Sequence, residues 1–369
     1  MKYLFLALLI IPGYLIHAQP AKLNPNNTTI SFEEVTDGLQ NPWGMAFLPN
    51  GDVLITEKSG DIRIIRDGQL IDQRIEGVPD VYVRGQGGLM DIELHPEFGS
   101  NQFLYLTYSS TEGPGNGGNT TLARFKLQGN NLTDKKILYK GVPNTTKGAH
   151  FGSRIAFDDQ GFIYFSIGDR HNRDINPQDI NRDGGKIYRL HDDGRIPDDN
   201  PFVASDKAKK AIYSYGHRNP QGMAKNPKTG KIWAHEHGPR GGDEVNVIHP
   251  GKNYGWPIIS YGINYNGTEF AEATSRPGME QPISYWVPSI APCGMTFVNG
   301  DKYPGWDGDL IVGSLKFGYL VHCTVEGDQI TGQEIIAEGI GRVRNVEQGP
   351  DGHLYVGVEG KGLYRLTVK

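Results

Sequence analysis

Apolar residues along this chain recur in short strand-like segments that are separated by glycine-containing turns. A typical segment has an apolar stretch, a turn around Gly, and a second stretch rich in β-branched or aromatic residues, as in GMAFLPNGDVLITE at 44–57. Related segments follow at 89–108, 153–168, 222–236, 294–314 and 346–358. Successive starts are 45 to 72 residues apart, which is enough for four short strands and their loops in each repeat.

This pattern predicts an all-β fold, a six-bladed β-propeller. Radial repetition of four-stranded sheets leaves only short, protected sheet edges. The 50 glycines and 23 prolines among 369 residues are consistent with many turns. Residues 29–34 are expected to add the last strand to the C-terminal sheet and so to close the ring. Two stacked sheets or two domains remain alternatives, because the repeat is weak.

The first residues predict an export signal. Lys2 precedes an apolar run at 4–11, and Ala18 is a plausible cleavage point. Pro12 and Gly13 interrupt the run before it is long enough to span a bilayer. We therefore expect a signal peptide over 1–18, one propeller domain over 19–369, no stable membrane span, and a periplasmic or secreted protein.

The charge and the cysteine content limit the possible functions. The 37 basic and 42 acidic residues give a net charge of −5, or −6 once Lys2 leaves with the signal. A net acidic chain argues against general nucleic-acid binding. Two cysteines, Cys293 and Cys323, are too few for a disulfide scaffold, and the sequence leaves open whether they pair.

Chemically capable side chains are densest between residues 215 and 257. Loops rich in Gly and Pro are costly to order, so polar groups fixed on them usually belong to a site. Arg218 and Asn219 directly precede Pro220, which favours an extended backbone at Asn219. This arrangement predicts that a guanidinium and an amide lie at the start of the following strand.

The segment HGPRGGDE within this region predicts an oxygen-rich cation site. Backbone carbonyls at Gly238 and Pro239, with carboxylates at Asp243 and Glu244, are ligands of the kind that Ca²⁺ prefers. The alternative is a turn followed by a solvated acidic pair.

His150 lies just before the third repeat, where a propeller presents ligands over its central channel. A neutral imidazole there could act as a general base near pH 7. A histidine hydrogen-bonded within a turn is the alternative, and the same alternative applies to His217, His235 and His237.

Four cations, Arg218, Lys316, Arg342 and Arg344, come from different repeats but comparable loop positions. Arg342 and Arg344 are two residues apart before a strand, so their guanidinium groups share one face and repel unless an anion or a carboxylate lies between them. A converging set would suit a ligand with several carboxylates or phosphates. Surface arginines paired with nearby Asp and Glu are the alternative.

Taken together, the motifs resemble the soluble quinoprotein sugar dehydrogenases, and the shorter aldose sugar dehydrogenases more than the longer glucose dehydrogenases. The matching segments cover most of residues 38–366 in family order. They are NPWGMAFLPNG, GQGGLMDIELHPEF, the His before GSRIAF, FSIGDR, GHRNPQG, HGPRGGDEVN, GKNYGWP, GINY, SLK and GRVRNVEQGPDG. That family is a six-bladed propeller that binds pyrroloquinoline quinone (PQQ) and Ca²⁺.

The resemblance implies a role for each matching position. His150 would take the proton from the anomeric hydroxyl of the sugar while hydride passes to PQQ. The backbone oxygens of Gly238 and Pro239 would hold the Ca²⁺ of the cofactor, and Glu244 and Tyr254 would hold a further, structural Ca²⁺. The neighbours of the cofactor would be Gln86, Arg218, Asn219, Tyr265, Lys316, Arg342 and Arg344.

Two positions depart from the longer glucose dehydrogenases. Ala149 stands where those enzymes carry Asp before the base, so another group is expected to orient His150. His237 stands where they carry Gln. Both departures bear on the pH optimum and the substrate range.

The resulting expectation is an exported oxidoreductase that oxidises aldoses to lactones and passes electrons to an external acceptor, as a monomer or homodimer. A Ca²⁺-dependent lactonase would have no use for convergent cations and should tolerate replacement of Arg342 and Arg344 with Ala. A propeller that only binds glycans or proteins would not bind PQQ. Both remain alternatives.

Overall fold

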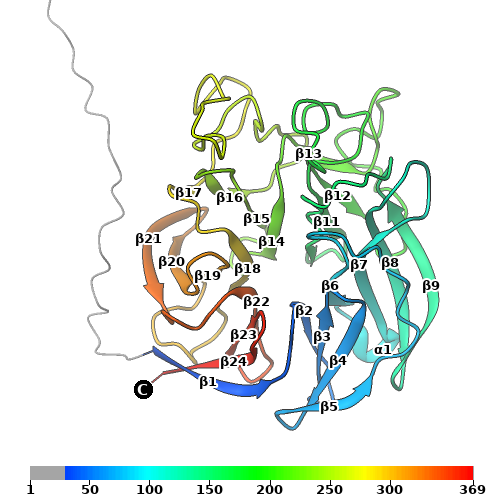
Figure 1. The fold of residues 1–369 in the computed structure, drawn as a ribbon, viewed down its shortest axis with the longest axis vertical. Coiled ribbons are helices and arrows are strands. Elements are labelled where there is room, and N and C mark those ends of the chain that lie inside the picture. Colours follow the sequence, from blue (N-terminus) through cyan, green and yellow to red (C-terminus); the bar gives the residue numbers. More distant parts are fainter. Residues whose placement is uncertain (1–29, 369) are drawn as a thin grey trace, which may run out of the picture.

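In the computed structural model, which describes residues 30–368, six four-stranded antiparallel sheets form a ring around a central channel (Figure 1). The predicted six-bladed β-propeller is confirmed. The predicted signal peptide, residues 1–18, lies outside the described residues. The 24 strands are accompanied by one short helix, α1 (Phe98–Asn101), within residues 30–368. No helix in this range has the length and the apolar character needed to cross a bilayer.

The first three sheets along the chain follow the same order, each strand pairing with the next. Their strands are β2 (Pro42–Phe47), β3 (Val53–Glu57), β4 (Asp61–Arg66) and β5 (Gln69–Arg74); β6 (Leu89–Leu94), β7 (Phe103–Ser110), β8 (Asn119–Gln128) and β9 (Asn131–Lys140); and β10 (Ile155–Phe157), β11 (Ile163–Ile167), β12 (Lys186–Leu190) and β13 (Ile212–Tyr215).

The other three sheets complete the ring. Their strands are β14 (Pro220–Lys225), β15 (Ile232–Glu236), β16 (Asp243–Val247) and β17 (Ser284–Trp286); β18 (Pro292–Phe297), β19 (Leu310–Ser314), β20 (Leu320–Glu326) and β21 (Gln329–Ile336); and β22 (Val343–Gln348), β23 (Leu354–Val358), β24 (Gly362–Val368) and β1 (Ile30–Asp37).

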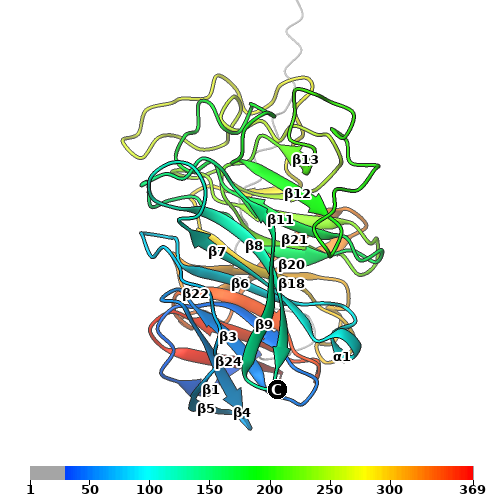
Figure 2. The ribbon, with the colours of Figure 1, turned by 90° about the vertical axis from the view of Figure 1, so that its right-hand side faces the viewer.

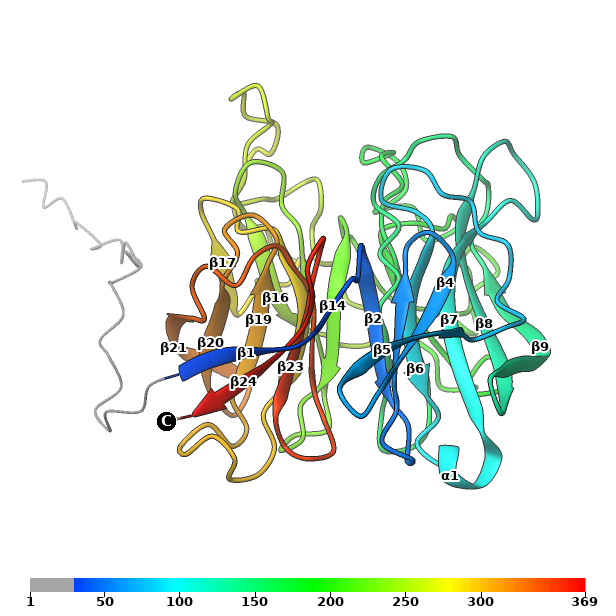
Figure 3. The same ribbon diagram turned by 60° about the horizontal axis from the view of Figure 1, so that its bottom comes forward.

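The last sheet joins the two ends of the described chain. β1 pairs antiparallel with β24, from Ile30 opposite Val368 to Asp37 opposite Gly362, and the two strands lie side by side in Figure 3. The rings of Phe32 and Tyr364 pack across this pair with their centroids 6.0 Å apart. The predicted closing strand is confirmed from Ile30 onward, whereas Thr29 is not described.

The first strand of each repeat, β2, β6, β10, β14, β18 and β22, lies innermost, and each packs against the next around the channel. β3, β11, β15 and β19, second in their sheets, are buried along their whole length, since neighbouring sheets cover both faces. The outer strand β21 alternates between exposed and less exposed residues, as expected for a strand with one face in water. Figure 2 shows the layered sheets from the side.

Cys293 in β18 and Cys323 in β20 are both buried, and neither forms a disulfide. Cys293 and Cys323 are therefore unpaired in this structure, and core packing stabilises the fold without a disulfide between them.

Candidate active site

The predicted site residues gather at the end of the ring where the inner strands begin. Gln86 precedes β6, His150 precedes β10, Arg218 and Asn219 precede β14, and Arg342 precedes β22. Gly238 and Pro239 follow β15, and Lys316 follows β19. Because β15 and β19 run antiparallel to their inner neighbours, they end where those neighbours begin, so all these loops share one face.

His150 is held in a specific and unusual conformation. Its backbone is left-handed, with φ of 56°, and only 6% of the residue is exposed. Its backbone N–H donates to Gln86 Oε1 at 2.7 Å, and its Nδ1 lies 2.6 Å from Asp169 Oδ1. An ionised carboxylate can only accept, so Nδ1 carries the proton and Nε2 keeps a free lone pair.

Asp169 is the group that orients the His150 side chain, a role that the presence of Ala149 led us to expect from another residue. It follows β11 and is fully buried. Its other oxygen, Oδ2, accepts a hydrogen bond of 2.9 Å from Trp256 Nε1, and Oδ1 also accepts from the backbone N–H of His171. Burial alone would raise its pKa, but hydrogen bonds from His150 and Trp256 and the charge of Arg218 lower the pKa of Asp169 below its ordinary value.

Arg170, the next residue, holds the loop that carries His150. Its guanidinium donates to the carbonyl oxygens of Gly118, Lys147 and Ala149 and lies 3.4 Å from the ring centroid of Phe151. These contacts fix the loop on both sides of the imidazole.

The imidazole of His150 is neutral at physiological pH. Burial, followed by the nearby charge of Arg218, lowers the pKa of His150 to about 4, against the opposing effect of Asp169. A buried, neutral histidine with one nitrogen oriented and the other free has the arrangement that a general base requires.

Arg218 and Asn219 contribute donors that the protein leaves unused. Arg218 Nη1 donates to the carbonyl oxygen of His237 at 3.0 Å, and Asn219 Oδ1 accepts from the backbone N–H of Gly152 at 3.1 Å. Arg218 Nε and Asn219 Nδ2 are buried and have no hydrogen-bond partner among the described residues. Since buried donors are almost always paired, these two atoms fit a ligand rich in acceptors.

Glu359 pairs with both Arg342 and Arg344, which is the alternative in which these arginines meet an acidic residue of the protein. It follows β23, and its oxygens accept from Arg342 Nε at 2.5 Å and from Arg344 Nε at 2.7 Å. Arg342 is the more open of the two, with 52% of its side chain exposed against 14% for Arg344. Lys316 is also exposed, with its Nζ 4.7 Å from the ring centroid of Phe317.

A small cavity lies beside these residues and brings together several predicted metal ligands. Its volume is about 10 Å³, close to the space that one water molecule needs, and its lining includes Arg218, Gly238, Glu244 and Tyr254. Burial and the neighbouring Glu236 raise the pKa of Glu244 to about 8. A cation placed there would relieve this repulsion.

The remaining predicted ligands differ in what they can offer. The hydroxyl of Tyr254 donates to the carbonyl of Val247 at 2.6 Å and accepts from the backbone N–H of His249 at 2.9 Å, so its backbone oxygen is the atom left for a metal. Asp243 accepts from the backbone N–H groups of Gly238 and Ile290, so it anchors the loop. No group of three or more His, Cys, Asp or Glu side chains within 30–368 is arranged as a metal site.

The other histidines of this region are structural. His217 is fully buried between Ser214 and Glu236, with its Nδ1 2.7 Å from Glu236 Oε1. His237 Nε2 lies 2.7 Å from the carbonyl oxygen of Pro292, and burial lowers the pKa of His237 well below its ordinary value. His235 is completely buried. Tyr265 is 72% exposed, and its predicted place beside a ligand remains a prediction.

A second cavity, of about 400 Å³, lies at the opposite end of the channel. It is lined by the last residues of β2, β6, β18 and β22, including Glu93 and Glu347. It contains no predicted site residue, so its larger volume does not make it the candidate active site.

Sequence reasoning missed Asp169, Trp256 and Glu359 as site residues. Asp169 lies in the motif FSIGDR and Trp256 in GKNYGWP, so both were within segments that carried the resemblance. The signal that could have found Asp169 and Glu359 is their place in the repeat. Each follows the second strand of its sheet, and these strands end on the site face.

Comparison with known proteins shows the family of this chain. The family model described as glucose / sorbosone dehydrogenase matches residues 39–365. The chain is 41% identical over 357 residues to aldose sugar dehydrogenase YliI of Escherichia coli strain K12, covering 95% of this chain and 94% of the relative.

Two solved structures extend the comparison. The apo-form crystal structure of the E. coli soluble aldose sugar dehydrogenase aligns with a TM-score of 0.89 at 40% identity, over 92% of this chain and 99% of that one. The PQQ-bound aldose sugar dehydrogenase of Streptomyces coelicolor aligns with a TM-score of 0.76 at 27% identity, over 94% and 99% of the two chains. The chain therefore belongs to the glucose/sorbosone dehydrogenase family and is a sugar dehydrogenase.

Proposed function

We propose that this protein oxidises the anomeric hydroxyl of aldose sugars to lactones, with PQQ as the hydride acceptor and Ca²⁺ as its metal. The observation that carries the proposal is the buried, neutral His150, whose Nδ1 is oriented by Asp169 at 2.6 Å and whose Nε2 is free at the mouth of the channel. Support also comes from the PQQ-bound Streptomyces relative. In this proposal, electrons leave to an external acceptor.

The residues at this face fit an anionic, acceptor-rich cofactor. Arg218 Nε and Asn219 Nδ2 are buried donors without partners in the described chain, and Lys316 and Arg342 are exposed cations on the same face of the ring. Gln86 and Arg344 would complete the polar contacts. The carbonyls of Gly238 and Pro239 would hold the Ca²⁺ of the cofactor, and Glu244 with the backbone oxygen of Tyr254 would hold a second Ca²⁺.

The protein's own part in the reaction is proton transfer and charge stabilisation. The bound quinone would supply the hydride acceptor, polarised by Ca²⁺ as a Lewis acid. His150 Nε2 would take the proton of the anomeric hydroxyl, and Asp169 would stabilise the resulting imidazolium through the Nδ1 hydrogen bond. Arg218 would stabilise negative charge on the substrate oxygen as that proton leaves.

Reconstitution tests the proposal directly. Purified protein is mixed with PQQ and Ca²⁺, and dye reduction is followed with pentoses, hexoses and disaccharides. Saturable PQQ binding with aldose-dependent turnover is expected. Absence of both PQQ binding and turnover with every sugar would refute the proposal.

Two histidine variants test the base. We expect His150→Ala to lower kcat by roughly 10²- to 10⁴-fold while PQQ binding is retained. His171→Ala is the matched control, since its exposed ring lies 4.8 Å from that of His150. If His171→Ala abolished turnover and His150→Ala did not, the base would be misassigned.

A further inference from the structure

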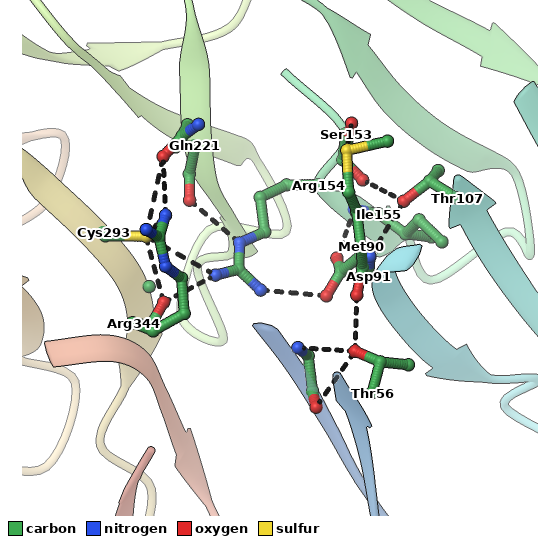
Figure 4. A network of polar contacts seen from close by, with 12 residues as sticks. Thr56, Met90, Asp91, Thr107, Ser153, Arg154, Ile155, Gln221, Cys293 and Arg344 are labelled. Carbon is green, nitrogen blue, oxygen red and sulfur yellow. Dashed lines mark hydrogen bonds and ion pairs between the residues drawn. The ribbon is translucent and has the colours of Figure 1, made fainter. Parts of the chain in front are cut away.

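One buried guanidinium, that of Arg154, contacts all six sheets of the ring. Arg154 lies directly before β10, and only 3% of the residue is exposed. Its contacts come from the innermost strand of each of the other five sheets. Figure 4 shows four of these partners, Asp91, Gln221, Cys293 and Arg344, around the guanidinium.

The contacts differ in kind and together use the whole guanidinium. Nη1 donates to Asp91 Oδ1 on β6 at 2.8 Å, and Nε donates to the carbonyl of Gln221 on β14 at 2.8 Å. Nη2 donates to the carbonyl of Arg344 on β22 at 3.0 Å and lies 3.9 Å from Cys293 Sγ on β18. The guanidinium carbon lies 4.2 Å from the ring centroid of Trp43 on β2.

Arg154 shares its partners with Arg344. The side-chain oxygen of Gln221 accepts from Arg344 Nη1 at 3.3 Å, while the backbone oxygen of the same residue accepts from Arg154. Cys293 Sγ lies 3.0 Å from the carbonyl oxygen of Arg344 and 3.5 Å from its Nη1. Both the backbone and the guanidinium of Arg344 are therefore fixed through the residues that surround Arg154.

The charges alternate along this chain of contacts. Asp91 neutralises Arg154 on one side, and Glu359 neutralises Arg344 on the other. Two guanidinium groups sharing neutral acceptors would repel without these carboxylates. Asp91 is itself held by the backbone N–H of Ile155 at 2.8 Å, so the anion and the cation are both tied to the start of β10.

We infer that Arg154 is a positioning residue that places Arg344 for an anionic ligand. Arg344 then reaches the site face in its correct orientation only when all six sheets meet at Arg154. The identity of that ligand as PQQ rests on the proposed function, whereas the positioning of Arg344 does not.

A conservative exchange tests this inference. Lys keeps the charge but has no planar fork of donors, so Arg154→Lys loses contacts to Gln221 and Arg344. The matched control is Arg189→Lys in β12, because Arg189 is also buried, pairs with Asp199 and lies 4.3 Å from an aromatic centroid, that of Phe162. Both variants are expected to lower the thermal midpoint.

Two measurements separate positioning from general stability. In the first, made without ligand, NMR follows hydrogen exchange of the Arg344 Nε–H. This signal is assigned by its loss in Arg344→Lys. We expect at least tenfold faster exchange in Arg154→Lys and less than twofold change in Arg189→Lys. In the second, PQQ titration of the cofactor-free full chain should show at least tenfold weaker binding in Arg154→Lys only.

Each outcome decides one of the two proposals. Native exchange in Arg154→Lys would overturn the positioning role, whether or not PQQ binds. Failure of the native protein to bind PQQ would refute the proposed function and leave the exchange result to decide the positioning role. If Arg154→Lys does not fold, Asp91→Asn keeps Arg154 but removes the carboxylate charge that holds its Nη1. Unchanged exchange of the Arg344 Nε–H in Asp91→Asn would overturn the inference.

Discussion

The left-handed backbone of His150 is an unfavourable local feature of the candidate site. A non-glycine residue with φ of 56° is uncommon, and such conformations persist only where the surroundings impose them. Here Gln86 holds the backbone N–H, Asp169 holds the side chain, and Arg170 holds the neighbouring carbonyls. Because the strained residue is also the one with a free imidazole nitrogen, its surroundings serve the site.

The hydrogen bond from His150 to Asp169 should matter for turnover more than for ligand binding. Asp169→Asn removes the negative charge and permits the wrong imidazole tautomer, so we expect kcat to fall by roughly 10²- to 10⁴-fold. The affinity for PQQ should change less than threefold. Asp183→Asn is the control, because Asp183 is a buried carboxylate that binds Tyr139, Tyr188 and the backbone of Val142. Equal kcat values in Asp169→Asn and the native enzyme would contradict the assigned role.

Protonation of His150 should occur at an unusually low pH. Its pKa is lowered to about 4 in the folded protein, whereas an unfolded chain has the ordinary value of 6.5. The folded state therefore favours the neutral form, and this site contributes stability above pH 6.5 that is lost as pH falls toward 4. The contribution is about 3 kcal/mol.

An NMR titration of the imidazole nitrogens measures this directly. The midpoint for His150 is expected near pH 4. The loss of stability between pH 6.5 and pH 4 should be shallower in His150→Gln than in the native protein. A midpoint near 6.5 for His150 would show that burial does not lower its pKa.

At the scale of elements, the loop after β23 controls the charge of the site. Glu359 compensates both Arg342 and Arg344, so their combined charge is partly neutralised before any ligand arrives. The two arginines also lower the pKa of Glu359 against the effect of burial, so this carboxylate is ionised at neutral pH. The site face is therefore less cationic than its sequence indicates.

Removal of this carboxylate should change how PQQ binding depends on salt. In Glu359→Gln the ligand meets two uncompensated guanidinium groups, so its affinity should fall more steeply as salt is raised. We choose 50 and 500 mM salt for the comparison, because the Debye length falls from about 14 Å to about 4 Å between these concentrations. Titrations at both concentrations measure the effect. Glu33→Gln is the control, since Glu33 pairs with Arg365 on the exposed edge of the same sheet. An equal or shallower dependence in Glu359→Gln would argue against charge compensation.

The elements were predictable because their pattern is local. Each repeat carries an apolar inner strand and a second strand that neighbouring sheets bury, and this produces a visible period in the sequence. The two-residue spacing of Arg342 and Arg344 likewise predicted a shared face, with either a ligand anion or a carboxylate of the protein between the two guanidinium groups. What the spacing did not reveal was which carboxylate, because Glu359 is 15 residues from Arg344 and meets it only after β22 and β23 pair.

The orienting role of Asp169 was hidden for the same reason. Asp169 is 19 residues from His150, and it reaches the imidazole because β10 and β11 pair antiparallel. Gly168 permits this approach, since a Cβ there would lie 2.5 Å from the carbonyl oxygen of His150. Contacts of this kind depend on register and on loop conformation, which a single sequence does not specify.

For the molecule as a whole, ring closure connects stability to the site. The sheet that contains Arg344 is completed by β1, which comes from the opposite end of the described chain (Figure 3). The site residues come from loops on five of the six sheets, so none of the loops forms the site alone. Their arrangement depends on each sheet being held against the next.

A chain that begins at Gly38 tests this dependence. Without β1, the backbone groups of β24 from Gly362 to Val368 lose their partners, and the exposed edge can pair with other chains. We expect a lower thermal midpoint, weaker PQQ binding and concentration-dependent association, followed by thermal unfolding, titration and size-exclusion chromatography. The control is Phe32→Ala, which removes the ring contact with Tyr364 and part of the packing against the core but keeps the strand pairing, and should cost about 2 kcal/mol. If the shortened chain matched the full chain in midpoint, PQQ affinity and elution volume, the ring would hold its site without β1, and closure would not be what positions Arg344.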